Sequence, residues 1–239
     1  MPVPVSTARV PKLLVFTDDV APRRHGRALL STLARACADL VVEDRGDLAV
    51  CVRAKHLDAD ARRALTLAVV DVVDVADIAV FAHDDAGLAA ALRLDGVHLA
   101  GGRDDDDDTA RVRAARLRLP PGAVLGLSSH PRHAGDRCTR DDVDYVTWSP
   151  VFAPASKQDA RAPIGVAALQ GHRPPVLALG GVDVDRVAAC RAAGARGVAV
   201  IGAVLGVADP ARALQQLLIA SEIPFRRRRR GVHPMPRAA

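Results

Sequence analysis

Residues 176–182 read VLALGGV, an apolar run that stops at two glycines. The run has the composition of a buried strand, yet Gly180 and Gly181 stand where any side chain would pack better than none. Residues 197–204, GVAVIGAV, repeat the pattern and end their apolar run at Gly202. Two successive strands with glycine at their carboxyl ends predict neighbouring units of a parallel sheet, whose backbone N–H groups approach an anion closely. A tight turn at Gly180 and Gly181 is the simpler alternative.

Similar apolar runs alternate with Ala-, Arg- and Leu-rich stretches of helical spacing along the chain, which is typical of repeated βα units. The eight strands expected are residues 13–16, 48–52, 78–82, 96–99, 123–127, 145–149, 176–180 and 197–201. Helices are expected at about 28–42, 58–73, 85–94, 109–118, 132–139, 164–171, 184–193 and 209–220, with Asp58, Thr109 and Asp183 as N-caps. Eight units predict an α/β fold, a (β/α)8 TIM barrel, with a doubly wound sheet as the alternative.

The composition supports one large α/β domain. Of the 239 residues, 49% are hydrophobic, which is enough for a full core. Only 3% are aromatic, so the core is expected to consist of Ala, Val and Leu, as in helices packed on parallel strands. So few aromatic residues argue against a stacking platform for nucleic acid.

The positive charge of the chain lies at its C-terminus. Residues 221–239 contain six Arg and one Glu, so the remaining 220 residues carry no net charge although the whole chain has +5. The run Arg226–Arg230 precedes a Gly- and Pro-containing end without apolar periodicity, which favours a solvated tail over an RNA-binding or membrane-binding patch. We therefore expect a flexible N-terminus at 1–11, a barrel at 12–220 and a basic disordered tail at 221–239.

Nothing in the sequence predicts export or a membrane. The first ten residues lack the apolar stretch of a signal peptide, and the apolar run at 69–81 is broken by three aspartates, well short of the roughly 20 residues that a membrane helix needs. The cysteines form no C-x-x-C pair, so reduced thiols are expected at Cys37, Cys51, Cys138 and Cys190. A cytoplasmic location follows from these features.

Charged residues follow the early strands of the expected barrel, at the end where TIM barrels carry their chemistry. Arg53 and Lys55 come after the second strand and suit a phosphate or diphosphate. His83 and Asp84 end the third strand, and a carboxylate beside cations and phosphate indicates Mg²⁺. Asp85 is expected to cap the next helix. The acidic run at 104–108 reads better as a solvated loop leading to a helix cap, with only Asp104 considered as a second metal ligand.

Polar side chains also follow the fifth and sixth strands. Ser128 could reach a phosphate, and His130 could exchange protons near neutral pH, although a single loop histidine is usually only polar surface. Ser156 and Lys157 lie in a long loop that could bring a cation over a substrate. No P-loop and no Ser-His-Asp arrangement is visible in the sequence.

Seven motifs in order resemble the thiamine phosphate synthase/TenI family of TIM barrels over residues 48–215. They are VCVRAKHLD, AHDD, DGVHL, LGLSSH, DYVTWSPVFAPASK, VLALGGV and AGARGVAVIGAV. The resemblance implies an enzyme of thiamin biosynthesis that joins hydroxymethylpyrimidine diphosphate to thiazole phosphate and releases diphosphate. Because such chemistry is mostly positioning and charge neutralisation, cations and Mg²⁺ would stabilise the departing diphosphate.

The resemblance also implies roles for individual residues. Arg53, Lys55, Ser128 and Lys157 match diphosphate contacts, with Ser156 beside them, and Asp84 matches the first metal-binding Asp. Gly180 with Gly181, and Ile201 with Gly202, match the backbone cradle of the thiazole phosphate. The chain departs from the family at five positions. They are Cys51 for Gln, Ala54 for Glu, His83 for Asn, Arg103 for the second metal Asp, which leaves Asp104 one residue late, and Pro154 for Thr.

Three functions stay open at this point. A thiamine phosphate synthase is favoured because Arg53, Lys55, Asp84 and Lys157 are all present. A TenI-like thiazole tautomerase needs no metal and would use His130 as acid and base. A third alternative is a non-catalytic barrel that binds a phosphate ligand; a different phosphate-binding barrel, such as a sugar-phosphate isomerase, would not explain VRAK, SSH and ASK together. The partners expected are small phosphate substrates, with homo-oligomerisation open and neither membrane nor nucleic acid expected.

Overall fold

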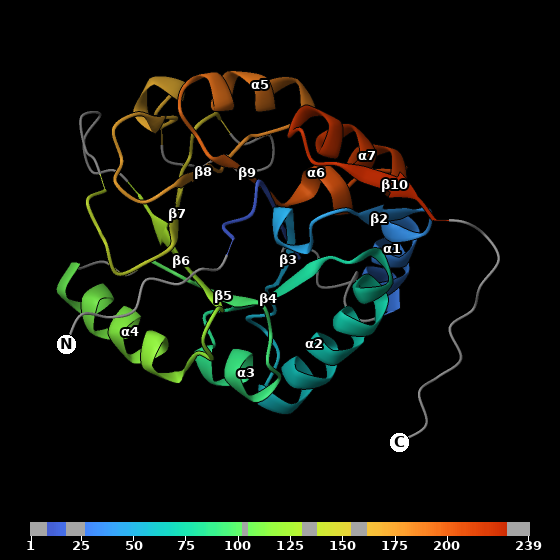
Figure 1. Ribbon diagram of the computed structural model, residues 1–239, viewed down its shortest axis with the longest axis horizontal. Helices are drawn as coiled ribbons and strands as arrows, with labels where there is room; N and C mark the ends of the chain where they lie inside the picture. The colour runs from blue at the N-terminus through green and yellow to red at the C-terminus, as the bar shows by residue number, and fades with distance from the viewer. Residues whose placement is uncertain (1–8, 18–26, 102–104, 131–137, 154–161, 229–239) are drawn as a thin grey trace.

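The computed structural model describes residues 9–17, 27–101, 105–130, 138–153 and 162–228. Eight parallel strands close into a barrel that helices surround (Figure 1). In spatial order they are β1 (Leu13–Phe16), β3 (Leu48–Val52), β4 (Ala79–His83), β5 (Gly96–Leu99), β6 (Val124–Ser129), β7 (Tyr145–Trp148), β8 (Val176–Ala178) and β9 (Gly197–Val200). The TIM-barrel prediction is confirmed, and the doubly wound alternative is wrong because β9 pairs with β1 and closes the sheet.

The helices follow the strands in the order expected. They are α1 (Arg27–Cys37), α2 (Ala59–Val73), α3 (Ala86–Ala91), α4 (Asp105–Arg118), α5 (Val184–Ala192), α6 (Gly202–Leu205) and α7 (Pro210–Ala220), with 3-10 turns at Arg45–Asp47, Asp74–Ala76 and Val166–Leu169. Asp58, Asp85 and Asp183 cap α2, α3 and α5 as predicted, each carboxylate accepting from a backbone N–H of the first turn. Within the described residues, no helix has the length and apolar character to cross a membrane.

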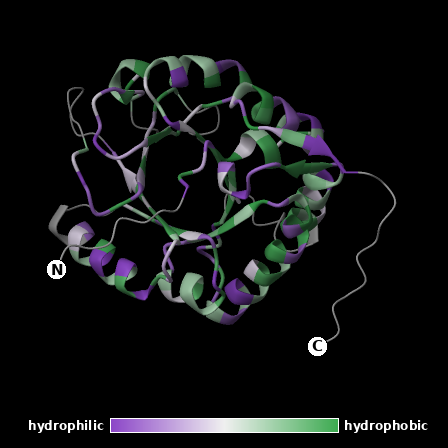
Figure 2. Cartoon of the chain, viewed as in Figure 1, coloured by the Kyte–Doolittle hydropathy of each residue, from purple (hydrophilic) through white to green (hydrophobic). Residues whose placement is uncertain are grey.

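The core has two parts because successive side chains of a strand point to opposite faces. The outer faces of the strands pack against the helices, with Val, Leu and Ala predominating as the composition predicts. The inner faces fill the barrel with a smaller cluster that includes Leu14, Cys51, Phe81 and Tyr145. Figure 2 shows the hydrophobic colour concentrated on the strands and on parts of the surrounding helices. Val10 packs against the inner cluster, so the boundary of the flexible N-terminus at residue 11 was placed too late.

The helix predicted at 28–42 is wrong at its end. α1 stops at Cys37, and β2 (Leu40–Val42) pairs antiparallel with β10 (Phe225–Arg227). The β-branched Val41 and Val42 favour a strand, and Leu40 and Val42 are buried by the pairing. The tail boundary at 220 is wrong for the same reason, because residues 221–228 return along β2; residues 229–239 lie outside the described residues.

Three other helix predictions need correction. α4 begins at Asp105, so part of the acidic run is helical rather than a loop, and Thr109 is not its cap; Asp108 pairs with Arg111 one turn later, at 3.1 Å. The helix predicted at 164–171 is only the 3-10 turn at Val166–Leu169, because the chain takes positive φ at Gly165 and Gly171. Most of the helix predicted at 132–139 lies outside the described residues, and Cys138 and Thr139 are not helical.

Candidate functional site

The carboxyl ends of the parallel strands form one rim of the barrel, and most of the predicted site residues lie on it. They are Arg53 and Lys55 after β3, His83 at the end of β4 and Asp84 directly after it, Ser128 and His130 on and after β6, Gly180 and Gly181 after β8, and Ile201 and Gly202 after β9. In the closed strand order, β8 and β9 lie across the barrel from β4 and β5. The glycine-bearing ends therefore face the Asp84 side across the mouth. Asp104, Ser156 and Lys157 lie outside the described residues.

Arg53 is held at the rim through its backbone. The hydroxyl of Thr17, buried at the end of β1, accepts a hydrogen bond from Arg53 N–H at 2.7 Å and donates one to the Arg53 carbonyl at 3.0 Å. Within the described chain, the half-buried Arg53 guanidinium has no carboxylate partner. Among the described residues, the rim therefore presents a cation without a carboxylate partner, with the exposed Lys55 two residues later. Sequence reasoning missed Thr17 because the two residues meet only when β1 and β3 pair.

Asp84 has a well-defined position, but its carboxylate already forms an ion pair with an arginine side chain. Its backbone takes φ 56°, its N–H donates to the His98 carbonyl at 2.8 Å, and its Oδ1 accepts from Ala100 N–H at 3.1 Å. The Arg111 guanidinium on α4 donates to the same Oδ1 at 2.6 Å. Sequence reasoning missed Arg111 in this role, since its spacing from Asp108 predicts only an ion pair along the helix. Asp84 Oδ2 accepts no hydrogen bond from the described residues.

Two departures from the family pattern are packed rather than exposed. Cys51 points into the barrel, where burial raises the pKa of its thiol and keeps it protonated. Ala54 is also buried, at 3% exposure. His83 is half-buried beside the rings of Phe16 and His98, with centroid distances of 6.2 Å to each. At these two positions the chain has replaced long polar side chains with small, buried ones.

A buried polar network lies below the rim. His98 on β5 is completely buried, with Nδ1 at 2.9 Å from the Tyr145 hydroxyl and Nε2 at 2.9 Å from Ser128 Oγ. Burial, with a smaller effect of His83, lowers the pKa of His98 to about 3, so the ring is neutral. Sequence reasoning placed DGVHL on a strand but missed His98 as part of the site, because its partners come from two other strands.

His130 lies above the end of β6 and contacts the end of β7. Its Nδ1 is 3.1 Å from the Ser149 carbonyl oxygen and 3.0 Å from the Ser149 hydroxyl. Because a carbonyl oxygen only accepts, this contact favours a proton on Nδ1 and leaves Nε2 with its lone pair. The ring is exposed, so Nε2 is accessible for proton exchange.

Gly180 and Gly181 differ from Gly202 in the space that surrounds their Cα atoms. Gly180 and Gly181 have positive φ, and a Cβ on either would lie 2.7 Å from the backbone of the Pro150–Ala153 segment, so both are needed for the turn itself. A Cβ on Gly202 would meet nothing within 4 Å. No group in the described chain accepts from the N–H of Gly180 or Gly181. The turn explanation therefore holds for the first pair, while the space at Gly202 suits a bound group.

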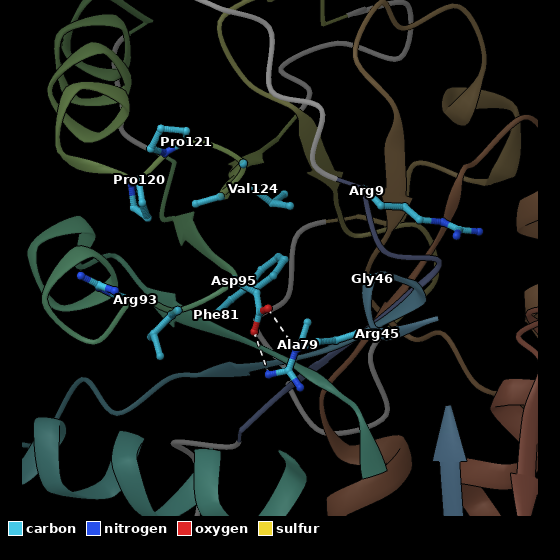
Figure 3. A pocket seen from close by; sticks show the side chains of 13 residues that line it. Arg9, Arg45, Gly46, Ala79, Phe81, Arg93, Asp95, Pro120, Pro121 and Val124 are labelled. Atoms are coloured by element: carbon cyan, nitrogen blue, oxygen red, sulfur yellow. Dashed lines mark hydrogen bonds and ion pairs between the residues drawn. The ribbon is translucent and has the colours of Figure 1, made fainter. Parts of the chain in front are cut away.

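The opposite end of the barrel has a pocket of about 340 Å³ that differs in character (Figure 3). Its walls include Arg45, Phe81, Asp95 and Pro121. Figure 3 shows the Asp95 carboxylate facing the Arg45 guanidinium. Two hydrogen bonds join them, from Nε to Oδ1 at 3.1 Å and from a terminal guanidinium nitrogen to Oδ2 at 3.2 Å. Since its central charges neutralise each other, we place the candidate site at the carboxyl-end rim.

Comparison with known proteins identifies the family. A family model described as thiamine monophosphate synthase matches residues 20–204. The chain belongs to this family. A thiamine-phosphate synthase of Methanoculleus marisnigri is 34% identical over 209 residues, covering 86% of this chain and 92% of the relative. One of Anaeromyxobacter dehalogenans is 36% identical and covers 90% of both chains.

A solved structure agrees with the fold assignment. The thiamine phosphate pyrophosphorylase of Pyrococcus furiosus superposes with a TM-score of 0.65 at 24% identity, covering 88% of this chain and 95% of that one. At this identity the likeness concerns the barrel rather than its chemistry. The resemblance inferred from the seven sequence motifs is thereby confirmed at the level of the family.

Proposed function

We propose that the protein is a thiamine-phosphate synthase, a transferase that joins hydroxymethylpyrimidine diphosphate to thiazole phosphate. In this reaction the thiazole nitrogen forms a bond to the pyrimidine methylene carbon, and the bond from that carbon to the diphosphate oxygen breaks, releasing diphosphate. Besides membership of the family, one observation supports the proposal most. Arg53, which has no carboxylate partner within the described ranges, and the open space at Gly202 lie on one rim, as an enzyme with two phosphorylated substrates requires.

The diphosphate is proposed to bind on the β3–β6 side of the mouth. The guanidinium of Arg53 would donate a charge-assisted hydrogen bond to the diphosphate, and Thr17 holds the Arg53 backbone in place. Lys55 and Ser128 add a second cation and a hydroxyl, and the loop residues Ser156 and Lys157 are proposed to complete the charge neutralisation. Positive charge at this position stabilises the leaving group as its C–O bond breaks.

The thiazole phosphate is proposed to bind at the β8–β9 side. The N–H groups of Gly180 and Gly181 have no acceptor in the described chain, and Gly202 leaves room beside Ile201. Backbone N–H groups without acceptors suit an anion because they are hydrogen-bond donors fixed in direction. Holding the phosphate there would aim the thiazole nitrogen across the mouth, toward the side of Arg53 and Ser128.

A magnesium ion fits this rim with few protein ligands. No group of three or more His, Cys, Asp and Glu side chains suited to a metal occurs in the described ranges. Mg²⁺ commonly takes one or two carboxylates, with substrate phosphate oxygens and water completing its shell. Asp84 would supply one oxygen through Oδ2, and Asp104 is the proposed second ligand. His83 directly precedes Asp84 in the chain, at the position of the family's Asn. When bound, the ion would neutralise part of the diphosphate charge.

The function is tested by incubating the purified full chain with thiazole phosphate, hydroxymethylpyrimidine diphosphate and Mg²⁺ and measuring thiamine phosphate. We expect product that disappears with EDTA and returns with excess Mg²⁺. Arg53→Ala is expected to lose product, whereas the exposed helix variant Arg63→Ala should retain it. Absence of product from folded protein with both substrates bound would overturn the synthase proposal.

A thiazole tautomerase is the second candidate, and the geometry of His130 favours it. With Nδ1 directed to Ser149, the exposed Nε2 could remove and return a proton on a bound thiazole. A tautomerase predicts isomerisation without Mg²⁺ and its loss in His130→Ala. Binding of thiazole phosphate without turnover in either assay would instead support the non-catalytic alternative. A cytoplasmic location and a homo-oligomer stay predictions.

A further inference from the structure

The His98 network has one arrangement of protons that satisfies every buried group. His98 and Tyr145, the chain's single tyrosine, are both completely buried. Within the described chain, the Tyr145 hydroxyl has one acceptor in reach, which is His98 Nδ1 at 2.9 Å. A buried phenol that did not donate there would leave its proton without an acceptor, which is costly. Tyr145 therefore donates to Nδ1, and Nδ1 carries no proton.

The protonation state of the second imidazole nitrogen, Nε2, follows from that of Nδ1. A neutral imidazole carries one proton, so the proton of His98 lies on Nε2 and is donated to Ser128 Oγ at 2.9 Å. This contact makes Ser128 an acceptor on its buried side. The next hydroxyl, Thr147 Oγ1, lies 3.5 Å away and is directed at Ser128 Oγ as a donor, so it does not take the serine proton. The Ser128 proton is thus free to be donated on the side of the mouth.

The strand register makes this contact possible. Gly126 on β6 is paired with Tyr145 on β7 and with His98 on β5. A Cβ at Gly126 would overlap the Tyr145 ring, so glycine is what allows the phenol to lie across β6 and reach the imidazole. The two rings lie nearly parallel, with centroids 5.5 Å apart. His98 therefore has one orientation fixed by packing as well as by hydrogen bonds.

We propose that His98 is a positioning residue whose protonation pattern, fixed by Tyr145, makes Ser128 an obligatory hydrogen-bond donor at the mouth. A serine hydroxyl free to rotate can donate or accept, whereas this one donates. Such a donor suits a phosphate or diphosphate oxygen, which only accepts, and disfavours a ligand that presents an N–H at the same place. The part of this role that concerns the substrate rests on the proposed function of Ser128 as a diphosphate contact.

The proton positions are tested without any substrate. Nitrogen NMR of the full chain labelled at histidine distinguishes the two neutral forms of His98. We expect a signal for unprotonated Nδ1 and protonated Nε2 that does not titrate between pH 5 and pH 8, and that changes in Tyr145→Phe. A proton on Nδ1 in the unmodified chain would overturn the inference, whatever reaction the protein catalyses.

The effect on Ser128 is tested by a double-mutant cycle. His98→Phe is expected to raise the KM for the pyrimidine diphosphate about tenfold while changing the KM for thiazole phosphate much less. His98→Gln, which keeps an N–H donor, should recover most of the loss, and His98→Phe should add nothing in a Ser128→Ala background. The neighbouring Ser129→Ala serves as the control. Equal rises in both KM values, or additive effects with Ser128→Ala, would overturn the role.

A second measurement separates this role from the proposed reaction. Binding of inorganic diphosphate, followed by calorimetry, requires no turnover. We expect Ser128→Ala and Tyr145→Phe to weaken it in the folded protein, and Ser129→Ala to leave it unchanged. If diphosphate binds and responds in this way while no thiamine phosphate forms, the synthase proposal fails and the role of His98 stands. If Tyr145→Phe binds as tightly as the unmodified chain, the role fails.

Discussion

The two ends of the barrel differ in how completely their charged side chains are paired. At the amino end, carboxylates are matched closely: Asp144 accepts from Leu125 N–H at 2.7 Å and from Arg116 at 2.9 Å, and Asp95 accepts from Val80 N–H and Arg45. At the carboxyl end, Arg53 has no carboxylate partner in the described chain. The difference indicates that the carboxylates of the amino end stabilise the fold, whereas Arg53 at the carboxyl end is available to a ligand.

The largest effect on stability is expected at Asp144 of the amino end, whose side chain is only 10% exposed. Replacing Asp144 with Ala leaves Leu125 N–H and Arg116 without their acceptor. We expect the free energy of unfolding, measured in urea, to fall by about 3 kcal/mol. The control is Asp141→Ala, because the Asp141–Arg173 pair is 65% and 62% exposed and should contribute less than about 1 kcal/mol. Equal losses in the two variants would contradict the assigned role of the amino end.

Arg53→Ala tests the opposite end. Losing a charge-assisted contact to diphosphate is expected to lower kcat/KM by about 100-fold, while the urea midpoint stays nearly unchanged because the guanidinium stabilises little else. Thr17→Val should lower kcat/KM as well, since it releases the Arg53 backbone. A large fall in stability with normal turnover per folded molecule would show that Arg53 is structural.

The buried His98 predicts a pH dependence of stability. Because its folded pKa is lowered to about 3, the unfolded chain takes up a proton below about pH 6.5 and the folded chain does not. The stability is therefore complete above about pH 6.5 and falls as the pH approaches 3. Between pH 7.5 and pH 5.5 we expect His98 to account for a loss of about 1 kcal/mol in urea denaturation. In His98→Gln, the free energy of unfolding should depend less steeply on pH by that amount. An unchanged pH dependence would contradict the assignment to His98.

The smallest effect is expected at Arg111, whose ion pair with Asp84 at the rim resembles those of the amino end. The Arg111–Asp84 pair is 32% and 40% exposed, so its loss should cost less than about 1 kcal/mol of stability. Arg111→Gln frees the Asp84 carboxylate from a competing cation. We expect the Mg²⁺ concentration for half-maximal turnover to fall a few-fold. A rise instead would mean that Arg111 assists the bound substrate.

Much of the fold could be predicted because its signals are local. Apolar runs of four or five residues marked the barrel strands, and Asp58 and Asp183 marked helix starts by capping chemistry. β2 was missed because Leu40–Val42 reads as the continuation of a helix until β10, far along the chain, pairs with it. Asp104, Ser156 and Lys157, which lie outside the described residues, stay predictions.

The candidate site divides in the same way. Arg53, Asp84, Ser128 and Gly202 could be predicted to lie at the mouth because each follows a strand of a predicted barrel, and strand ends share one rim. Their roles stay predictions. Thr17, His98, Tyr145 and Arg111 were not found, because each acts through a residue on another element. No spacing along the chain reports that His98 of β5 contacts β6 and β7 at once.

The sequence by itself determined the alternation of strands and helices, the family and the residue types at the mouth, because these depend on periodicity, turn chemistry and short motifs. Only the tertiary structure decided which groups are already neutralised and which are open. That distinction depends on distances between different strands and helices, such as 2.9 Å from His98 to Ser128 and 2.6 Å from Arg111 to Asp84, which exist only after the barrel closes.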